Sequence, residues 1–191
     1  MPLTFLTGGA RSGKSTLAVE LAERSGLPVT FIATAPLPPP DSPDHDADMA
    51  ERIARHQAER PDGWVTVEAP IDLDSAIDAA ATGTFTVIDC LTLWVSNLMW
   101  DGCTDDGIVE RAEAAAQRCA ATADPVVVVT NEVGLGVHPD TALGRRYRDV
   151  LGSVNQRWAA RADHSFLLVA GRALRLDAPS IVLDETGTPH R

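Results

Sequence analysis

The sequence predicts an α/β domain in which a mostly parallel sheet is covered by helices on both faces. Near-continuous apolar runs of strand length alternate with longer segments of helical periodicity, as in sheets buried on both sides. A glycine-rich segment also joins the first apolar run to the first helical segment, as in phosphate-binding proteins. We expect residues 1–191 to form one domain, with a surface loop at 35–48 and a C-terminal strand or tail at 176–191.

The individual elements follow from hydrophobic periodicity. Short apolar runs predict strands at Leu3–Leu6, Val29–Ala33, Trp64–Val67, Phe85–Ile88, Val126–Thr130 and Phe166–Val169, with Ile181–Leu183 closing one edge. Helical spacing predicts helices over 15–25, 46–60, 71–81, 90–100, 106–122 and 141–161. Ligands of such sheets bind beyond the carboxyl ends of the strands, so functional residues are expected in the loops that follow them.

The overall charge excludes some classes of partner. The net charge of -11 argues against a general nucleic-acid or anionic-membrane binder, which would carry a basic surface. No apolar run approaches the roughly 20 residues that a membrane span requires. Cys90, Cys103 and Cys119 lack the CxxC spacing of a metal or redox site and suit a reducing compartment. We therefore expect a cytoplasmic protein with no nucleic-acid partner and no membrane span.

The segment from Gly8 to Ser15 fits the pattern GxxxxGK[ST] between a strand and a helix. The glycines allow backbone N–H groups to surround phosphate oxygens, and the helix that follows adds its positive end. Lys14, the one lysine among 16 basic residues, is expected to reach the β- and γ-phosphates. The Ser15 hydroxyl is expected to hold Mg²⁺. The motif indicates a nucleoside triphosphate without specifying the reaction.

Two carboxylates follow apolar strands. Asp89 ends the fourth predicted strand and stands where a P-loop protein carries its Mg²⁺-associated acid. Glu132 follows the fifth strand and competes for the same role.

The predicted helix over 46–60 carries a histidine among arginines. Arg52, His56 and Arg60 are spaced by four and share one stripe. Neighbouring positive charges favour neutral imidazole, which is the nucleophilic form, and arginines bind phosphate oxygens. Taken alone, however, this helix fits an ordinary solvated surface better than a nucleophile site. The preceding 35–48 segment fits an inert connector as well as a lid.

Several segments together resemble a known family. They are TGGARSGKS, FIATA, DMAERIARHQAERPDGWVTVEAP, IDCLTLWVSNL, VTNEVGLGVHP and RRYRDVLGSVNQRWAARAD, in this order from residue 7 to about 163. The combination is similar to the bifunctional adenosylcobinamide kinase / adenosylcobinamide-phosphate guanylyltransferase of cobalamin biosynthesis. The resemblance implies a RecA-like P-loop NTPase fold and a homotrimer.

The same resemblance implies two reactions. The family phosphorylates adenosylcobinamide with ATP or GTP, with Mg²⁺ as cofactor. It then transfers GMP from GTP to adenosylcobinamide phosphate, giving adenosylcobinamide-GDP and pyrophosphate through a GMP–histidine intermediate. His56 stands at the position of the family's histidine, which makes His56 and Lys14 the implied catalytic residues.

The resemblance also implies the binding residues. The nucleotide contacts are Gly8, Gly9, Ala10, Arg11, Ser12, Gly13, Lys14, Ser15, Thr16, Thr34, Ala35, Pro36, Gln57, Arg60, Glu68 and Asp89. Ser15 and Asp89 are the metal residues, although either Glu68 or Asp89 suits the guanine edge. Trp94, Trp100 and the 145–148 arginines are candidates for substrate or subunit contacts, with core packing equally suitable for the tryptophans.

The sequence departs from the family pattern in three places. The 35–48 loop is longer and richer in proline, His138 replaces an expected apolar residue, and the tail after Arg175 matches little. Two other readings fit the P-loop by itself: a small-molecule kinase without nucleotidyl transfer, and a nucleotide-dependent switch that binds a partner.

Overall fold

The computed structural model describes residues 3–35, 51, 61 and 63–185. The predictions for His56, Pro36, Gln57 and Arg60 lie outside these residues. So do the 46–60 helix, apart from Glu51, and the 35–48 loop, apart from Ala35.

A seven-stranded sheet with the order β3-β2-β4-β5-β1-β6-β7 forms the centre of the molecule. Its strands are β1 (Leu3–Gly8), β2 (Val29–Ala33), β3 (Val65–Glu68), β4 (Phe85–Asp89), β5 (Val126–Val129), β6 (His164–Val169) and β7 (Arg172–Leu176). All neighbouring pairs are parallel except β6 and β7, which are antiparallel. The mostly parallel sheet is therefore confirmed.

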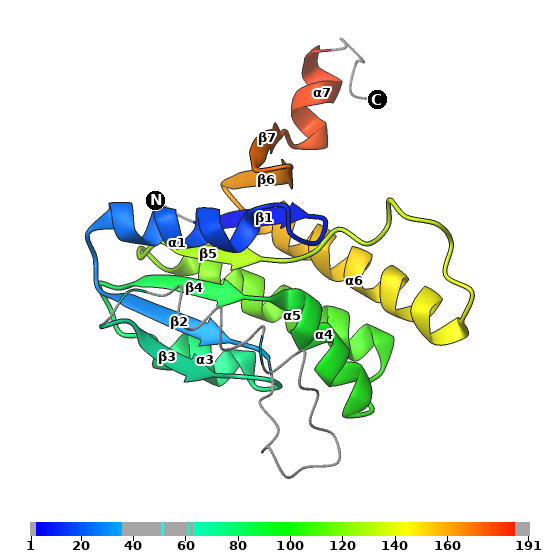
Figure 1. Cartoon of the computed structure of the whole chain (residues 1–191), viewed down its shortest axis with the longest axis horizontal. Coiled ribbons are helices and arrows are strands. Elements are labelled where there is room, and N and C mark those ends of the chain that lie inside the picture. The colour runs from blue at the N-terminus through cyan, green and yellow to red at the C-terminus, as the bar shows by residue number, and fades with distance from the viewer. Residues whose placement is uncertain (1–2, 36–50, 52–60, 62, 186–191) are drawn as a thin grey trace.

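Helices cover both faces of this sheet (Figure 1). They are α1 (Lys14–Ser25), α3 (Leu73–Ala79), α4 (Leu91–Trp100), α5 (Asp105–Ala121), α6 (Ala142–Arg161) and α7 (Pro179–Glu185). Side-chain oxygens cap the first turn of three of them: Asp72 at α3, Thr104 at α5 and Thr141 at α6. None of the helices in the described part of the chain has the length and apolarity that crossing a bilayer requires.

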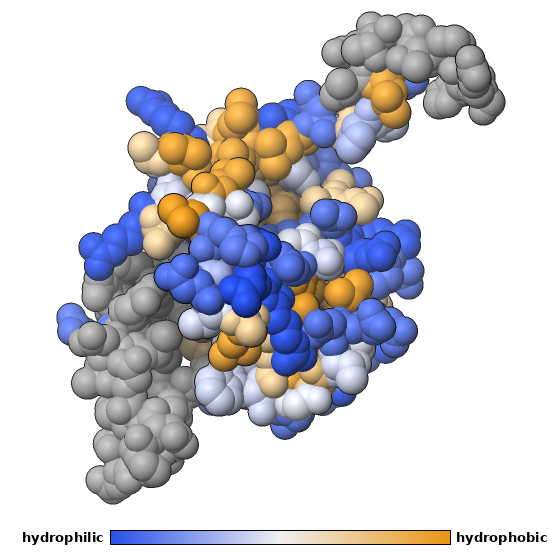
Figure 2. Space-filling model, turned by 90° about the vertical axis from the view of Figure 1, so that its right-hand side faces the viewer, coloured by the Kyte–Doolittle hydropathy of each residue, from blue (hydrophilic) through white to orange (hydrophobic). Residues whose placement is uncertain are grey.

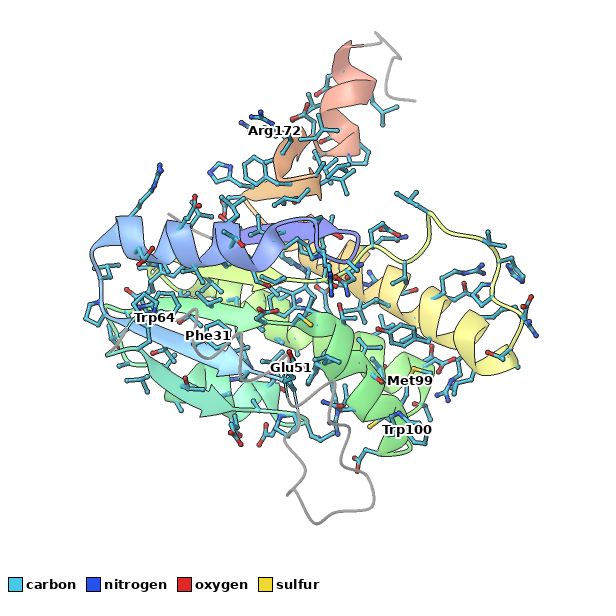
Figure 3. The ribbon with its side chains drawn as sticks, viewed as in Figure 1. Phe31, Glu51, Trp64, Met99, Trp100 and Arg172 are labelled. Atoms are coloured by element: carbon cyan, nitrogen blue, oxygen red, sulfur yellow. The ribbon has the colours of Figure 1, made fainter. Side chains whose placement is uncertain are left out.

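The core has two layers because strand residues alternate between the two faces of the sheet. Leu3 and Phe5 of β1 pack with α3, α4, α5 and α6, where Trp94 and Trp158 are the largest fully buried side chains. Leu6 faces the other layer, with Ala18 and Ala22 of α1. Trp64 closes the edge of this second layer by stacking on Phe31, with the ring centroids 6.3 Å apart (Figure 3).

The predicted edge strand at Ile181–Leu183 is wrong, because these residues lie in the short helix α7. The edge strand is β7, which forms a hairpin with β6 around Ala170 and Gly171. Both turn residues have positive φ, 50° and 72°, as in the turn type that suits twisted hairpins. This hairpin and α7 project from the body of the molecule (Figure 1).

Candidate nucleotide site

The predicted phosphate-binding loop connects β1 to α1 at the carboxyl edge of the sheet. Gly9, Ala10 and Arg11 are exposed, so the outer side of the loop is open to a ligand. Its inner side rests on the β6–β7 hairpin, where the Gly171 N–H donates to the Ser12 carbonyl oxygen at 3.0 Å. The hairpin thus supports the inner side of the loop.

Gly8 fits this arrangement because it has no side chain. Its φ is 148°, and an added Cβ would lie 2.3 Å from the carbonyl oxygen of Leu168 in β6. No such contact surrounds Gly9, which has nothing within 4 Å of an added Cβ. The close packing of β1 on β6 therefore requires glycine at position 8.

We expect Gly8→Ala to lower the free energy of unfolding by about 1–3 kcal/mol, through backbone strain and the clash with Leu168. Gly9→Ala is the matched control, with an expected change within about 0.5 kcal/mol. Urea denaturation of both variants measures the difference. Equal stabilities would contradict the close β1–β6 approach.

Lys14 is folded onto the loop that precedes it. Its Nζ donates to the carbonyl oxygens of Gly8 at 2.9 Å and Gly9 at 2.7 Å, and to Ser12 Oγ at 3.3 Å. The residue is only 7% exposed. Burial lowers the pKa of its ammonium group, and the neighbouring Cys90 and Asp89 side chains partly oppose this shift. Lys14 and Asp89 therefore belong to one electrostatic site.

The ends of β2 and β4 are joined beside this lysine. The Thr34 N–H donates to the Asp89 carbonyl oxygen at 3.2 Å, and the Cys90 N–H donates to Thr34 Oγ1 at 2.8 Å. The Thr34 hydroxyl donates in turn to the Cys90 carbonyl oxygen at 2.7 Å. Burial, with a contribution from Asp89, raises the pKa of the Cys90 thiol to about 12. Cys90 is consequently protonated at neutral pH and is a poor nucleophile.

Asn97 of α4 fixes the neighbouring strand ends. Its Nδ2 donates to the carbonyl oxygens of Thr34 at 2.8 Å and Pro70 at 2.9 Å. Asn97 lies in the WVSNL segment, but no role was predicted for it from the sequence. An amide on a helix whose neighbours are apolar is the signal that would have indicated it.

A buried polar network also fixes the end of β5, the strand between β1 and β4. The Thr130 hydroxyl donates to Asn155 Oδ1 at 2.8 Å, and Asn155 Nδ2 donates to the Asn131 carbonyl oxygen at 3.1 Å. The Asn131 N–H donates to Thr92 Oγ1 at 2.8 Å. No role was predicted for this network from the sequence. The available signal was Asn155 itself, a polar residue in the buried stripe of α6 between Leu151 and Trp158.

Glu68 lies at the same edge of the sheet but farther from the P-loop. It ends β3, is exposed and is paired with Ala33 of β2. At about 4.8 Å between neighbouring strands, β3 is roughly 10 Å from β4 and roughly 19 Å from β1. Glu68 and Asp89 are therefore at different distances from the phosphate-binding loop.

The other candidates for substrate or subunit contacts fall into two groups. Trp94 is buried and donates its indole N–H to the Ile71 carbonyl oxygen at 2.9 Å, so it is a core residue. Trp100 is exposed at the end of α4 (Figure 3). The arginines of α6 bind neighbouring parts of the chain: Arg145 the carbonyls of Pro139 and Asp140, Arg146 the Asp105 carboxylate, and Arg148 the Asp149 carboxylate and the His138 ring.

The site offers few protein ligands for a metal. Within the described ranges, no three or more His, Cys, Asp or Glu side chains form a metal-binding group. Mg²⁺ in nucleotide sites typically takes one or two protein oxygens and completes its shell with phosphates and water. Ser15, in the first turn of α1, and Asp89, at the end of β4, offer oxygens of the required kind.

Comparison with known proteins identifies relatives over nearly the whole chain. Residues 4–176 match the family described as cobinamide kinase / cobinamide phosphate guanyltransferase. The bifunctional adenosylcobalamin biosynthesis protein CobP of Pseudomonas aeruginosa is 40% identical over 174 residues, which cover 90% of this chain and 95% of the relative. The corresponding protein CobU of Escherichia coli is 37% identical over 190 residues, which cover 91% and 99%.

Solved structures are similar in fold at low sequence identity. The type III secretion ATPase EscN from enteropathogenic E. coli gives a TM-score of 0.59 at 10% identity, covering 97% of this chain and 44% of that chain. The flagellar accessory protein FlaH from Methanocaldococcus jannaschii gives 0.51 at 14% identity, covering 92% and 78%. The chain thus spans less than half of EscN. These similarities confirm the expected RecA-like P-loop fold.

Proposed function

The chain belongs to the cobinamide kinase / cobinamide phosphate guanyltransferase family, and we propose that it phosphorylates adenosylcobinamide with ATP or GTP and then guanylylates the product. In the second reaction, GMP passes from GTP to adenosylcobinamide phosphate and gives adenosylcobinamide-GDP and pyrophosphate. The chain is therefore an enzyme with kinase and guanylyltransferase activities in cobalamin biosynthesis. The observation that carries the proposal is the family match over residues 4–176, which includes the complete P-loop.

In this proposal GMP transfer proceeds through His56. The imidazole attacks the α-phosphorus of GTP and expels pyrophosphate, and the substrate phosphate then attacks the phosphoramidate and restores neutral His56. Arg52 and Arg60, four residues before and after His56 in the sequence, would keep the imidazole neutral and bind phosphate oxygens. A covalent intermediate divides one displacement into two easier ones.

The P-loop serves both reactions. Lys14 and the loop N–H groups stabilise the charge that develops on the phosphate oxygens, because positioning and electrostatics dominate phosphoryl transfer. Bound Mg²⁺, held by Ser15 and Asp89, would neutralise charge on the leaving phosphates. One nucleotide site then carries out both steps at different times.

We assign Asp89 to Mg²⁺ and Glu68 to guanine. The charge of Asp89 acts on the Lys14 ammonium, which supports a role beside the phosphates. Glu68, roughly 19 Å from β1 across the sheet, suits the other end of an extended nucleotide. A carboxylate there accepts from guanine N1–H and N2–H₂ and would select GTP over ATP.

The first test uses GTP labelled at the α-phosphorus, Mg²⁺ and protein, without corrinoid. We expect acid-labile, alkali-stable label on the denatured protein, which is the behaviour of a histidine phosphoramidate. A protein that binds GTP but takes up no label would be a simple kinase or a nucleotide-dependent switch instead. Corrinoid-dependent ADP formation separates these two alternatives.

We also propose that the protein is a cytoplasmic homotrimer. Its three cysteines are free thiols, and its proposed substrates are intracellular nucleotides. The β6–β7 hairpin and α7 carry exposed apolar side chains on a projecting segment: Val169, Leu174, Leu176, Ile181 and Leu183. Hydrophobic residues also gather in the upper part of the molecule, at the height of β6 and β7 (Figure 2). Apolar surface concentrated on a projection is typical of a subunit interface.

We expect Leu174→Glu to convert the trimer to monomers, because a charge in an apolar interface loses its hydration without gaining a partner. Leu143→Glu is the matched control, since Leu143 is 56% exposed and Leu174 61% exposed. Light scattering coupled to size-exclusion chromatography measures both masses. A trimeric Leu174→Glu variant would remove this hairpin from the interface.

A further inference from the structure

The kinase and guanylyl-transfer steps differ in one chemical requirement. In the kinase step the nucleophile is an alcohol, which must lose a proton as it attacks the γ-phosphorus. In the proposed transfer steps the nucleophiles are a neutral imidazole and an ionised phosphate, which already present lone pairs. A base near the phosphates is therefore required for the first activity and dispensable for the second.

The backbone of Glu132 lies next to the P-loop lysine. Its N–H donates to the carbonyl oxygen of Gly8 at 3.1 Å, and Lys14 Nζ donates to the same oxygen at 2.9 Å. One carbonyl oxygen thus joins the backbone of Glu132 to the ammonium that is expected to bind the β- and γ-phosphates. The contact follows from topology, because β5 lies directly between β1 and β4.

The carboxylate of Glu132 is held in a defined orientation. Its Oε1 accepts the Gly134 N–H at 2.6 Å. Among the described residues, the other carboxylate oxygen, Oε2, is not engaged by a hydrogen bond. The backbone before it is fixed by the Thr130–Asn155–Asn131–Thr92 network. This preorganisation is typical of a catalytic group whose position must be maintained.

The loop after Glu132 suits a large organic substrate. Leu135 is 82% exposed and Val137 is 95% exposed, so apolar side chains are open to solvent three and five residues after Glu132. Hydrogen bonds hold the C-terminal end of this loop to α6, where Arg145 Nη1 donates to the carbonyl oxygens of Pro139 and Asp140. A supported loop with an apolar tip is a suitable contact for the corrinoid that carries the alcohol.

We propose that Glu132 is the general base of the kinase step. This inference rests on the proposed function. The substrate O–H bond breaks as its proton passes to Glu132 Oε2, the oxygen forms a bond to the γ-phosphorus, and the bond from that phosphorus to the bridging oxygen breaks. The nucleoside diphosphate leaves with the electron pair. Asp89 remains with Mg²⁺, so the two carboxylates that competed for one role have separate roles.

The test is Glu132→Gln, which keeps the shape of the side chain and an oxygen that can accept from Gly134. We expect kcat for phosphorylation of adenosylcobinamide to fall by about 100-fold or more, the usual contribution of a general base. Labelling by GTP, and GMP transfer to adenosylcobinamide phosphate supplied ready-made, should stay within about threefold of wild type because neither needs this base. Glu110→Gln, an exposed position on α5, is the control and should retain both activities.

Every other outcome would overturn either this inference or the proposed function. Equal loss of both activities would make Glu132 a Mg²⁺ or nucleotide residue and would overturn the inference. Full retention of the kinase activity would overturn it as well, while leaving the two-reaction proposal standing. A wild-type protein that phosphorylates no corrinoid would instead overturn the proposed function, and this inference with it.

Discussion

Replacing His56 with alanine should abolish GMP transfer and covalent labelling by GTP while sparing most of the kinase activity. The imidazole is the proposed acceptor of GMP, so no other group can form the intermediate in the variant. We expect a fall of at least about 10³-fold in transfer, equivalent to about 4 kcal/mol of transition-state stabilisation. The kinase step uses the substrate alcohol as nucleophile and needs no imidazole, so its rate should change by less than about tenfold.

The experiment measures both reactions on the same preparations. Corrinoid phosphorylation is followed with ATP, and GMP transfer with pre-phosphorylated corrinoid and GTP. His164→Ala is the matched control, because His164 begins β6, at the edge of the sheet opposite the P-loop. Equal loss of both reactions in His56→Ala would indicate a structural histidine.

His56→Ala and Glu132→Gln form a reciprocal pair. The first is expected to remove transfer and spare the kinase, whereas the second is expected to remove the kinase and spare transfer. A misfolded or poorly active preparation cannot produce both patterns, because general damage lowers the two rates together. The pair therefore tests whether one nucleotide site uses two different side chains for its two reactions.

Much of the fold follows from the sequence because the central strands are buried on both faces. Runs such as Val126–Val129 have no polar side to present, so hydrophobicity alone locates them. The C-terminal segment does not follow this rule. Every residue of β7 is exposed in the chain as described, and Ile181–Leu183 is an apolar run too short to distinguish a strand from a helical turn.

The site residues likewise fall into those that the local sequence indicates and those that depend on tertiary packing. The P-loop and Asp89 are predictable because local sequence encodes a strand, a turn and a phosphate-binding backbone. Asn155 and Thr92 were missed because their roles depend on which helices pack beside the end of β5, which is a tertiary property. The shared Gly8 carbonyl that joins Glu132 to Lys14 is likewise set by strand order, with more than a hundred residues between the partners.

Lys14→Ala should damage both reactions. The Lys14 ammonium is the buried positive charge of the P-loop, and both transition states place negative charge on the same phosphate oxygens. Removing one such preorganised donor typically costs about 10²–10³ in kcat, or about 2.7–4 kcal/mol. Lys14→Arg should not restore activity, because a planar guanidinium cannot reproduce the three contacts of a compact ammonium that is 7% exposed.

The measurement is kcat and KM for ATP-dependent phosphorylation and for GMP transfer, with Arg24→Ala as the control because Arg24 lies in the last turn of the same helix. We expect the control to retain both activities and the two Lys14 variants to lose both by similar factors. Loss of one activity alone would mean that the reactions use separate nucleotide sites. In that case the second site would have to lie away from the Lys14–Asp89 pair, and the assignment of Asp89 to Mg²⁺ would hold for only one of the two reactions.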